Sequence, residues 1–433
     1  MRCLGIILML LVLLPPASEA QEQTREVPAI HISGMITPAM ATYVLRAIDE
    51  AEARDAPFLL MRMDTPGGLL DATQDIVGAM LEAPVPTVVY VSPRGASAGS
   101  AGAFITLAAH VAVMAPATNI GAATPIQPGV EMDRDDPAYE KMMRYTESYI
   151  EMIAEERDRN VEWARSAVRD GVAVTASEAV ELNVIDFIAA SDTELLERLH
   201  GWEIDDVVLD TENVVIVDVP MTIVERFFQL LFRPELIFIL MLVAIYGIIG
   251  ELSNPGAILP GFVGLMALLL LLYTIAVLPL NLFGFALIGL AILLFITELF
   301  VPSYGLLSLG GVAAFIAGSL LIFEGVSPVF ELSLWVVIPA TVITALFFMF
   351  AVGAGLRAQF GAVRAGKETL VGQHVKAMTP IDEKGGKVFI EGEIWNAVSD
   401  EPIEKGQWVR VDSVNGLTLN VSPKQNTQTD AYR

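Results

Sequence analysis

Short apolar runs and amphipathic segments alternate along residues 26–217 of the chain. Continuous apolar runs of this kind are typical of strands buried in a parallel sheet, and apolar residues repeating every three or four positions are typical of helices packed on it. The predicted strands are Val27–Ile36, Phe58–Met63, Thr87–Val91 and Val111–Met114. The predicted helices are Pro38–Ala53, Leu69–Glu82, Ala101–Ala109, Tyr139–Asn160, Glu162–Asp170 and Ala176–Leu182. This alternation predicts a layered α/β domain, which we place at residues 21–220.

Residues 223–356 contain long apolar runs that predict a bundle of transmembrane helices. Four runs approach the ~20 residues that a helix needs to cross a bilayer: Ile258–Leu278, Leu282–Phe300, Leu306–Phe323 and Leu334–Ala354. A fifth run, Leu236–Gly250, is shorter and follows the amphipathic segment Ile223–Phe232. It either crosses the membrane or lies as an interfacial or re-entrant segment. We expect about five spans.

Residues 368–424 predict a separate, small β-barrel. Short β-rich segments are separated by glycine-containing turns: Val375–Met378, Lys387–Ile390, Glu393–Ala397, Trp408–Val414 and Thr418–Val421. Five short strands in so short a segment suit a barrel of the OB type. Because the segment has little basic excess and few aromatic residues, it favours a protein-docking or structural role over nucleic-acid binding.

The first 20 residues predict a secretory signal peptide. Arg2 precedes the apolar run Leu4–Leu14, and the small residues Ser18 and Ala20 suit cleavage after Ala20. The only cysteine, Cys3, lies in this leader. The mature chain therefore has no thiol for a disulfide, a nucleophile or a metal site.

Basic residues after the last apolar run predict the topology of the membrane domain. Arg357, Arg364 and Lys367 follow that run, and the positive-inside rule places them in the cytoplasm. A chain that starts outside and ends inside crosses the membrane an odd number of times. We expect an integral protein of the cytoplasmic membrane, with the α/β domain outside the cytoplasm and the barrel inside.

The composition also supports the division into a membrane domain and an acidic domain outside the membrane. Hydrophobic residues make up 54% of the chain, which exceeds the usual share in soluble proteins. The formal net charge is −25, and residues 21–222 contain 34 Asp and Glu against 13 Lys and Arg. So acidic a surface should repel nucleic acid, which proteins bind through basic side chains.

Small residues and a hydroxyl gather between Pro93 and Pro125, where a strand is predicted to turn into a helix. Ser100 opens that helix, so its hydroxyl would lie beside the free N–H of Ala101. Gly67 and Gly68 follow another strand and offer N–H groups without side chains. Because the ends of parallel strands converge, these groups could form a nucleophile and an oxyanion hole.

Spacing alone does not identify the base that would activate such a serine. Lys141, which follows Ser100 by 41 residues, is the only lysine before residue 367. It could act as a base if burial lowered its pKa, or it could be a solvated helix residue. His110 lies at the far end of the helix that Ser100 opens, so we do not expect it to reach the serine. Ser97 is a rival nucleophile or a turn residue.

The sequence gives only weak support for a metal site or for a proton-relaying transporter. The acidic cluster Asp133, Asp135 and Asp136 has no nearby histidine and no EF-hand spacing, so we expect a solvated loop, no metal and no cofactor. Glu251 and Glu298 lie near span ends and are too few to indicate a transporter.

Taken together, these motifs resemble the NfeD family of membrane-bound serine proteases of the ClpP class, in its long form. The resemblance covers nearly the whole chain. The matching motifs are Asp64-Thr-Pro-Gly-Gly, Gly95-Ala-Ser-Ala-Gly-Ser-Ala-Gly, Met114-Ala-Pro-Ala-Thr-Asn-Ile-Gly-Ala, Asn183-Val-Ile-Asp, Glu251-Leu-Ser-Asn-Pro-Gly and Gly392-Glu-Ile-Trp-Asn-Ala. Ala117 departs from the pattern, because glycine is expected there.

The resemblance implies a ClpP/crotonase-like fold with a Ser–Lys dyad at Ser100 and Lys141. It implies an oxyanion hole at Gly67 or Gly68 and at Ala101. Relatives with a Ser–His–Asp triad have a histidine after the next strand, and none stands in the corresponding loop here, which favours the lysine. A stomatin-like (SPFH) membrane protein is the implied substrate or partner.

We therefore predict a membrane-anchored serine endopeptidase that cleaves apolar segments of membrane-associated proteins. We expect it to contact the lipid bilayer, to form at least a homodimer and to bind no nucleic acid. The alternative is a non-catalytic membrane scaffold that assembles with a stomatin-like protein.

Overall fold

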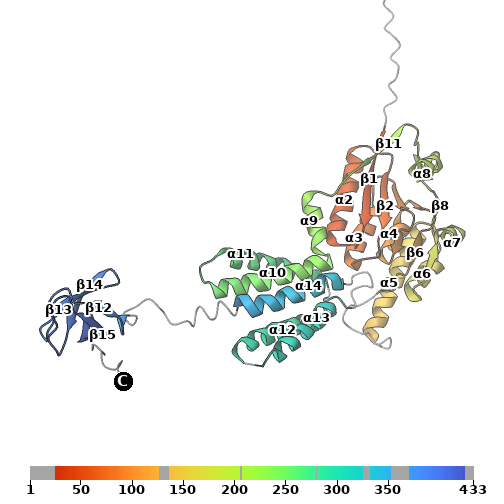
Figure 1. Ribbon diagram of the computed structural model, residues 1–433. Coiled ribbons are helices and arrows are strands. Elements are labelled where there is room, and N and C mark those ends of the chain that lie inside the picture. Colours follow the sequence, from red (N-terminus) through yellow and green to blue (C-terminus); the bar gives the residue numbers. More distant parts are fainter. Residues whose placement is uncertain are drawn as a thin grey trace, which may run out of the picture. The chain divides into compact units, whose positions relative to one another are not determined.

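The computed structural model describes residues 25–125, 136–204, 207–278, 280–301, 303–324, 332–352 and 370–424. The chain divides into two compact units, Met1–Ala351 and Val352–Arg433. The first contains an α/β domain and a set of apolar helices, and the second is a small β-barrel (Figure 1). This order confirms the predicted fold class. The predicted signal peptide lies outside the described residues.

A six-stranded parallel sheet forms the centre of the α/β domain, in the order β11-β1-β2-β3-β5-β8. Its strands are β1 (Arg25–Ser33), β2 (Leu59–Asp64), β3 (Thr87–Val91), β5 (Val111–Met114), β8 (Phe187–Ile188) and β11 (Val214–Asp218). All four predicted strands are present. The first ends at Ser33 rather than Ile36, because the chain turns at Gly34 with φ +78°.

Short strands form two further pairings that the apolar pattern does not predict. A three-stranded sheet has the order β4-β6-β7, from β4 (Ser97–Gly99), β6 (Asn119–Gly121) and β7 (Ala173–Thr175). Strands β9 (Glu203–Ile204) and β10 (Val207–Val208) pair with each other. Thr65, just after β2, forms a bridge with Ala98 of β4. The small sheet is thereby attached to the end of the large one.

Helices bury both faces of the large sheet, as Figure 1 shows. The helices are α2 (Pro38–Ala53), α3 (Leu70–Leu81), α4 (Ala101–Ala108), α5 (Pro137–Glu156), α6 (Val161–Arg169), α7 (Ala176–Glu181) and α8 (Asp192–Leu199). Met61 and Met63 of β2 belong to the core that contains α2, α3 and α4, whereas Leu60 packs in the other core with Leu195 and Leu199 of α8. Alternate residues of one strand therefore face opposite layers.

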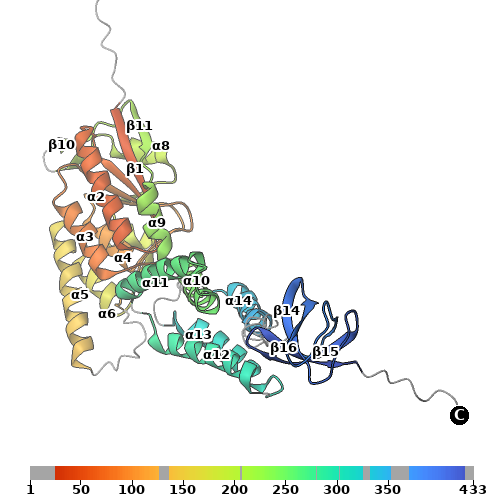
Figure 2. The ribbon, with the colours of Figure 1, turned by 90° about the vertical axis from the view of Figure 1, so that its left-hand side faces the viewer.

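Helix α9 (Ile223–Leu231) connects the α/β domain to the apolar helices and lies beside α2 (Figure 2). It matches the amphipathic segment predicted from the sequence. Phe228 and Phe232 make edge contacts with Tyr273 of α11 at centroid distances of 5.8 and 6.1 Å. The connection between the two parts is thus a packed helix.

The apolar helices are α10 (Pro234–Ser253), α11 (Leu259–Val277), α12 (Leu282–Phe300), α13 (Leu306–Leu321) and α14 (Leu334–Leu346), and a π-helical segment, Phe347–Val352, continues α14. Of the described residues, only α10, α11 and α12 form helices long and apolar enough to cross a membrane by themselves. The segment that the sequence leaves open, Leu236–Gly250, lies within the 20 residues of α10. The total of about five spans stays a prediction.

The two acidic residues near span ends accept hydrogen bonds in the turns between helices. The Glu298 carboxylate accepts hydrogen bonds from the Ser303 hydroxyl at 2.6 Å and from the N–H groups of Gly305 and Ser308 at 2.9 and 3.0 Å. Glu251 accepts one from the N–H of Gly256 at 3.3 Å. Glu298 thereby satisfies backbone donors at the start of α13, which agrees with a structural role.

The C-terminal unit is a five-stranded, nearly closed barrel with the order β12-β15-β16-β14-β13. Its strands are β12 (His374–Lys376), β13 (Gly386–Ile390), β14 (Glu393–Val398), β15 (Trp408–Asn415) and β16 (Thr418–Pro423). A bridge between Ala377 and Val388 links the two ends of this order. Val388, Val409 and Val411 are among the fully buried residues of its core. The predicted small barrel is confirmed.

Candidate active site

Ser100 lies on a strained turn between β4 and α4. Its backbone has φ 47° and ψ −110°, a conformation that costs an L-residue about 1–3 kcal/mol and is concentrated at functional sites. Its N–H donates to the Gly121 carbonyl at 2.9 Å, and its own carbonyl accepts from the N–H of Ala103 at 2.9 Å. The residue is partly buried, and among the described residues its hydroxyl has no hydrogen-bond partner. The backbone therefore fixes Ser100 at the start of a buried helix.

The Gly67–Gly68 loop lies directly against Ser100. A Cβ added to Gly67 would stand 2.7 Å from the Cβ of Ser100 and 3.2 Å from its Oγ. The buried hydroxyl of Thr65 donates to the Gly34 carbonyl at 2.6 Å and accepts from the N–H of Gly67 at 3.1 Å. The structure thus brings together the loop after β2 and the start of α4, as the sequence predicts.

The N–H groups around Ser100 differ in whether they already have an acceptor. Those of Gly67 and Ser100 donate to Thr65 and Gly121. In the described ranges, the N–H groups of Gly68 and Ala101 have no protein acceptor. The geometry therefore leaves Gly68, rather than Gly67, with a donor available for an oxyanion, beside that of Ala101.

Ser97, the rival nucleophile, makes hydrogen bonds that hold neighbouring strands together. Its hydroxyl donates to the Asn119 side-chain oxygen at 2.6 Å, and its N–H donates to the Asp64 carboxylate at 3.1 Å. Its carbonyl accepts from the N–H of Thr65 at 2.8 Å. Ser97 therefore connects β4 to its neighbours, whereas the Ser100 hydroxyl has no partner among the described residues.

Lys141 lies on the first turns of α5, and its side chain is exposed. Across the described ranges, the lysine amine has no hydrogen bond or ion pair, and none connects it to Ser100. No described contact therefore joins the predicted base to the predicted nucleophile. The Ser100–Lys141 dyad stays a prediction.

Three of the four histidines have partners away from Ser100. The His110 Nδ1 accepts from the N–H of Thr87 at 3.1 Å, at the opposite end of α4. His31 contacts Asp218 at 3.3 Å, and His200 accepts from the N–H of Thr211 at 3.4 Å. None of these contacts presents an imidazole to the serine.

The remaining sequence observations have structural explanations. Ala117, found where glycine is expected, has φ 63°, in the left-handed region that glycine occupies most easily. Asp136 caps α5 by accepting from the N–H of Ala138 at 2.8 Å, while Asp133 and Asp135 lie outside the described residues. Within the described parts of the chain, no group of three or more His, Cys, Asp and Glu residues could hold a metal ion.

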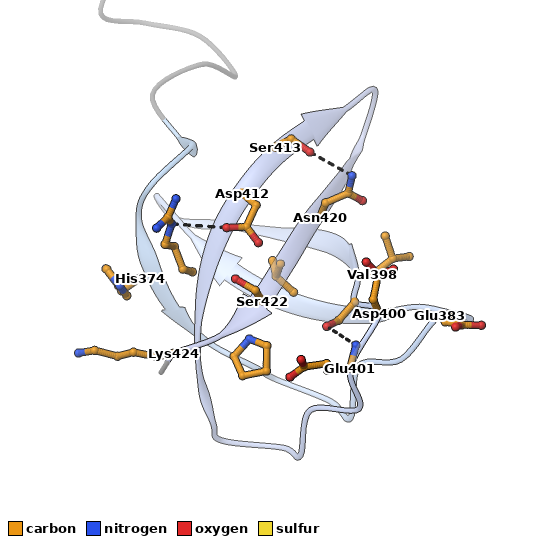
Figure 3. A pocket seen from close by; sticks show the side chains of 14 residues that line it. His374, Glu383, Val398, Asp400, Glu401, Asp412, Ser413, Asn420, Ser422 and Lys424 are labelled. Atoms are coloured by element: carbon orange, nitrogen blue, oxygen red, sulfur yellow. Dashed lines mark hydrogen bonds and ion pairs between the residues drawn. The ribbon is translucent and has the colours of Figure 1, made fainter. Parts of the chain in front are cut away.

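A polar hollow on the C-terminal barrel was not predicted from the sequence. Its lining mixes acids and bases, including Glu401, Asp412 and Lys424 (Figure 3). Arg410 pairs with Asp412 at 3.4 Å, and the Asn420 amide donates to the Ser413 hydroxyl at 3.0 Å. Arg410, Asp412 and Ser413 lie on β15, Asn420 lies on β16, and Glu401 lies in the loop before β15. The hollow therefore combines a strand with its hairpin partner and a loop.

Comparisons with known proteins agree with this architecture. Three family models match the chain: the NfeD1b N-terminal domain at residues 26–200, the NfeD integral membrane domain at 235–353, and the NfeD-like C-terminal, partner-binding domain at 367–423. The fold and the matches define a three-part membrane protein whose relatives include a protease. The chain belongs to the NfeD family.

One similar protein is the membrane-bound protease PH1510 of Pyrococcus horikoshii, with 32% identity over 404 residues, which cover 90% of this chain and 91% of that protein. Another is the membrane protein NfeD1b of Bacillus subtilis, with 28% identity over 448 residues, which cover 96% and 97%.

Solved structures of a stomatin-specific, membrane-bound protease, 1510-N, also match. A lysine-to-alanine mutant in complex with a substrate peptide has 31% identity and a TM-score of 0.45, covering 48% of this chain and 98% of that one. A serine-to-alanine mutant has 31% identity and a TM-score of 0.44, covering 46% and 99%.

Proposed function

We propose that this chain is a membrane-anchored serine endopeptidase with Ser100 as the nucleophile. The observation that carries the proposal is the turn at Ser100, where the serine lies against the backbone of Gly67 and next to the Ala101 N–H, which has no acceptor in the described residues. A serine at a helix start beside backbone donors supplies two of the parts that acyl transfer needs, a nucleophile and oxyanion donors. The similar protein PH1510, named a membrane-bound protease, supports the class of reaction.

In the proposed reaction, the Ser100 Oγ attacks the carbonyl carbon of a peptide bond while its proton passes to the neutral Lys141 amine. The carbonyl oxygen becomes an oxyanion that accepts hydrogen bonds from the N–H groups of Gly68 and Ala101. The C–N bond then breaks, and the leaving amine takes the proton from Lys141. Water hydrolyses the acyl-serine by the same steps and restores the enzyme.

The spacing of the two residues supports Lys141 as the base. In the 1510-N structures, the mutated serine and lysine are 41 positions apart, which equals the separation of Ser100 and Lys141. A lysine acts as a base only when its surroundings exclude water. Because Lys141 is exposed here, the mechanism requires a state in which substrate, or a second copy of the chain, covers its amine.

The proposed substrate is an apolar segment of a membrane-associated protein of the stomatin type. Support comes from the relative described as stomatin-specific and from the match of the C-terminal domain to a partner-binding family. In this proposal the α/β domain acts outside the cytoplasm, the barrel lies inside it, and the enzyme works as a homo-oligomer.

The full chain in nanodiscs, incubated with a quenched fluorescent peptide of apolar sequence, tests the proposal. We expect wild-type cleavage, and loss of cleavage for Ser100→Ala and for Lys141→Ala. Ser97→Ala is the matched control and should keep activity. Equal cleavage by wild type and Ser100→Ala would remove the mechanism, whereas loss in Ser97→Ala alone would reassign the nucleophile.

A non-catalytic scaffold is the second candidate function. Two observations favour it: the Lys141 side chain is exposed and has no partner among the described residues, and the barrel matches a partner-binding family. A serine-reactive fluorophosphonate separates the two candidates. If no adduct forms on Ser100 while a stomatin-like protein still co-purifies with the chain, the scaffold is correct.

A further inference from the structure

We propose that Gln229 of α9 is a positioning residue for the active-site loop. Its amide binds the segment Met35–Thr37, and this segment in turn supports Gly67 and Gly68 beside Ser100. The inference rests on the proposed function of Ser100. It adds that the helix leading into the first apolar span sets the geometry of the oxyanion donors.

Helix α9 is fastened to the α/β domain by a charged contact. Arg46 of α2 donates to both carboxylate oxygens of Glu225, from Nε at 2.8 Å and from a terminal nitrogen at 2.9 Å. The Glu225 side chain is only 8% exposed. A two-point, largely buried contact of this kind fixes both the position and the rotation of a helix.

One helical turn further on, Gln229 uses both ends of its amide. Its nitrogen donates to the Met35 carbonyl at 2.9 Å, and its oxygen accepts from the Thr37 hydroxyl. The same hydroxyl accepts from the N–H of Met40 at 3.2 Å and so caps α2. Gln229 therefore binds the backbone of Met35, which precedes Ile36, and the side chain of Thr37, which follows it.

Ile36, between these two contacts, pairs with the active-site loop. Its N–H donates to the Gly67 carbonyl at 3.0 Å, and its carbonyl accepts from the N–H of Leu69 at 2.9 Å. A Cβ added to Gly68 would stand 2.3 Å from the Ile36 carbonyl oxygen, so the two backbones are already in close contact. A shift of Ile36 must therefore shift Gly68.

Gly67 is the last link between α9 and the nucleophile, because it contacts Ser100. Contacts thus run without a gap from α9 to the nucleophile, through Met35–Thr37 and the Gly67–Gly68 loop. Oxyanion donors act only at hydrogen-bond distance, and small displacements of such groups lower rates steeply. Loss of the Gln229 contacts should therefore reduce turnover more than substrate binding.

The experiment uses the full chain in nanodiscs with the quenched apolar peptide. Gln229→Met removes both amide contacts at similar volume. Gln229→Glu keeps the oxygen that faces Thr37 and loses the donation to Met35. Arg226→Ala is the matched control, since the Arg226 side chain is exposed on the same helix and makes no hydrogen bond or ion pair in the described structure.

We expect Gln229→Met to lower kcat by about threefold to tenfold with KM unchanged, and Arg226→Ala to match wild type. Gln229→Glu should lower kcat at least as much as Gln229→Met, because its carboxylate oxygen would face the Met35 carbonyl oxygen. Hydrogen exchange should rise at the amides of Ile36 and Leu69 and stay unchanged in β3. Equal kcat and equal exchange in Gln229→Met and Arg226→Ala would overturn the inference. A uniform rise in exchange across the sheet would also overturn it, because Gln229 would then only stabilise the domain.

The exchange measurement separates this inference from the proposed function. If wild type neither cleaves the peptide nor reacts with a fluorophosphonate, the proposed function fails. The exchange at Ile36 and Leu69 in Gln229→Met still decides whether α9 positions the loop.

Discussion

Gly67 and Ser100 are in such close contact that no side chain fits between them: a Cβ on Gly67 would stand 2.7 Å from the Cβ of Ser100. The two residues follow different strands, β2 and β4, and are 33 positions apart in the chain. Gly67 also has φ +127°, which L side chains rarely adopt. The candidate site therefore depends on a glycine for both space and conformation.

Gly67→Ala should abolish reaction at Ser100, because the added methyl group must displace either the serine or the loop. We expect the rate of fluorophosphonate labelling to fall by at least about a hundredfold. Gly95→Ala is the matched control. Gly95 has φ +89° but nothing within 4 Å of an added Cβ, so it adds the conformational cost without a clash. Similar labelling rates in the two variants would contradict the prediction.

Ser97→Ala and Asn119→Ala should have nearly the same effect, because each removes one side of the same hydrogen bond. We expect each to destabilise the domain by about 0.5–1.5 kcal/mol while Ser100 still reacts. Thermal unfolding and fluorophosphonate labelling measure the two effects. A Ser97→Ala variant of full stability that no longer labels would make Ser97 part of the chemistry.

The Arg46–Glu225 contact should make the attachment of α9 sensitive to acid. The hydrogen bond from Arg46 is the main cause that lowers the pKa of Glu225, and the hydrogen bonds from Thr222 add to it, while burial opposes them. Because the folded pKa lies below the unfolded one, the contact stabilises the protein above the unfolded pKa. This stabilisation is lost as the pH falls through the folded pKa.

Glu225→Gln should therefore cost about 1–3 kcal/mol at pH 7, towards the lower end because Arg46 is 31% exposed and partly screened by solvent. The difference in Tm from wild type should narrow as the pH falls below about 4. Glu140→Gln is the control, since Glu140 and its partner Arg144 are 62% and 77% exposed. A gap in Tm that stays constant from pH 7 to pH 3 would refute the assignment.

Arg159 should be irreplaceable by lysine. Its side chain is 4% exposed and donates to the carbonyls of Leu107, Ala109 and Val184 and to the Asp186 carboxylate, at 3.0–3.2 Å. One ammonium group cannot reach acceptors spread around a planar guanidinium. We expect Arg159→Lys to cost about 2–4 kcal/mol in denaturant unfolding. Arg198→Lys, at a half-exposed pair with Glu194, should cost little.

The regular elements of this protein were predictable because their patterns are long enough to show a period. Helices Pro38–Ala53 and Leu282–Phe300 begin and end where their apolar patterns do. The three-residue strands β4, β6 and β7 were not predictable, since a period of two needs more residues than they have. Yet β4 carries Ser97 up to the turn at Ser100, and β6 ends at the Gly121 carbonyl that fixes the backbone of Ser100.

The sequence by itself determined the order of the parts and the residue types at the candidate site. Apolar periodicity specifies the α/β layers, the membrane helices and the barrel, and the small residues around Ser100 specify an open turn. The tertiary structure alone decided three points: in the described residues the N–H of Gly68, unlike that of Gly67, has no acceptor; the Ser97 hydroxyl is bound by Asn119; and α9 contacts the segment supporting the loop. The reason is that hydrogen-bond partners and close contacts join residues far apart in the chain, which no local pattern encodes.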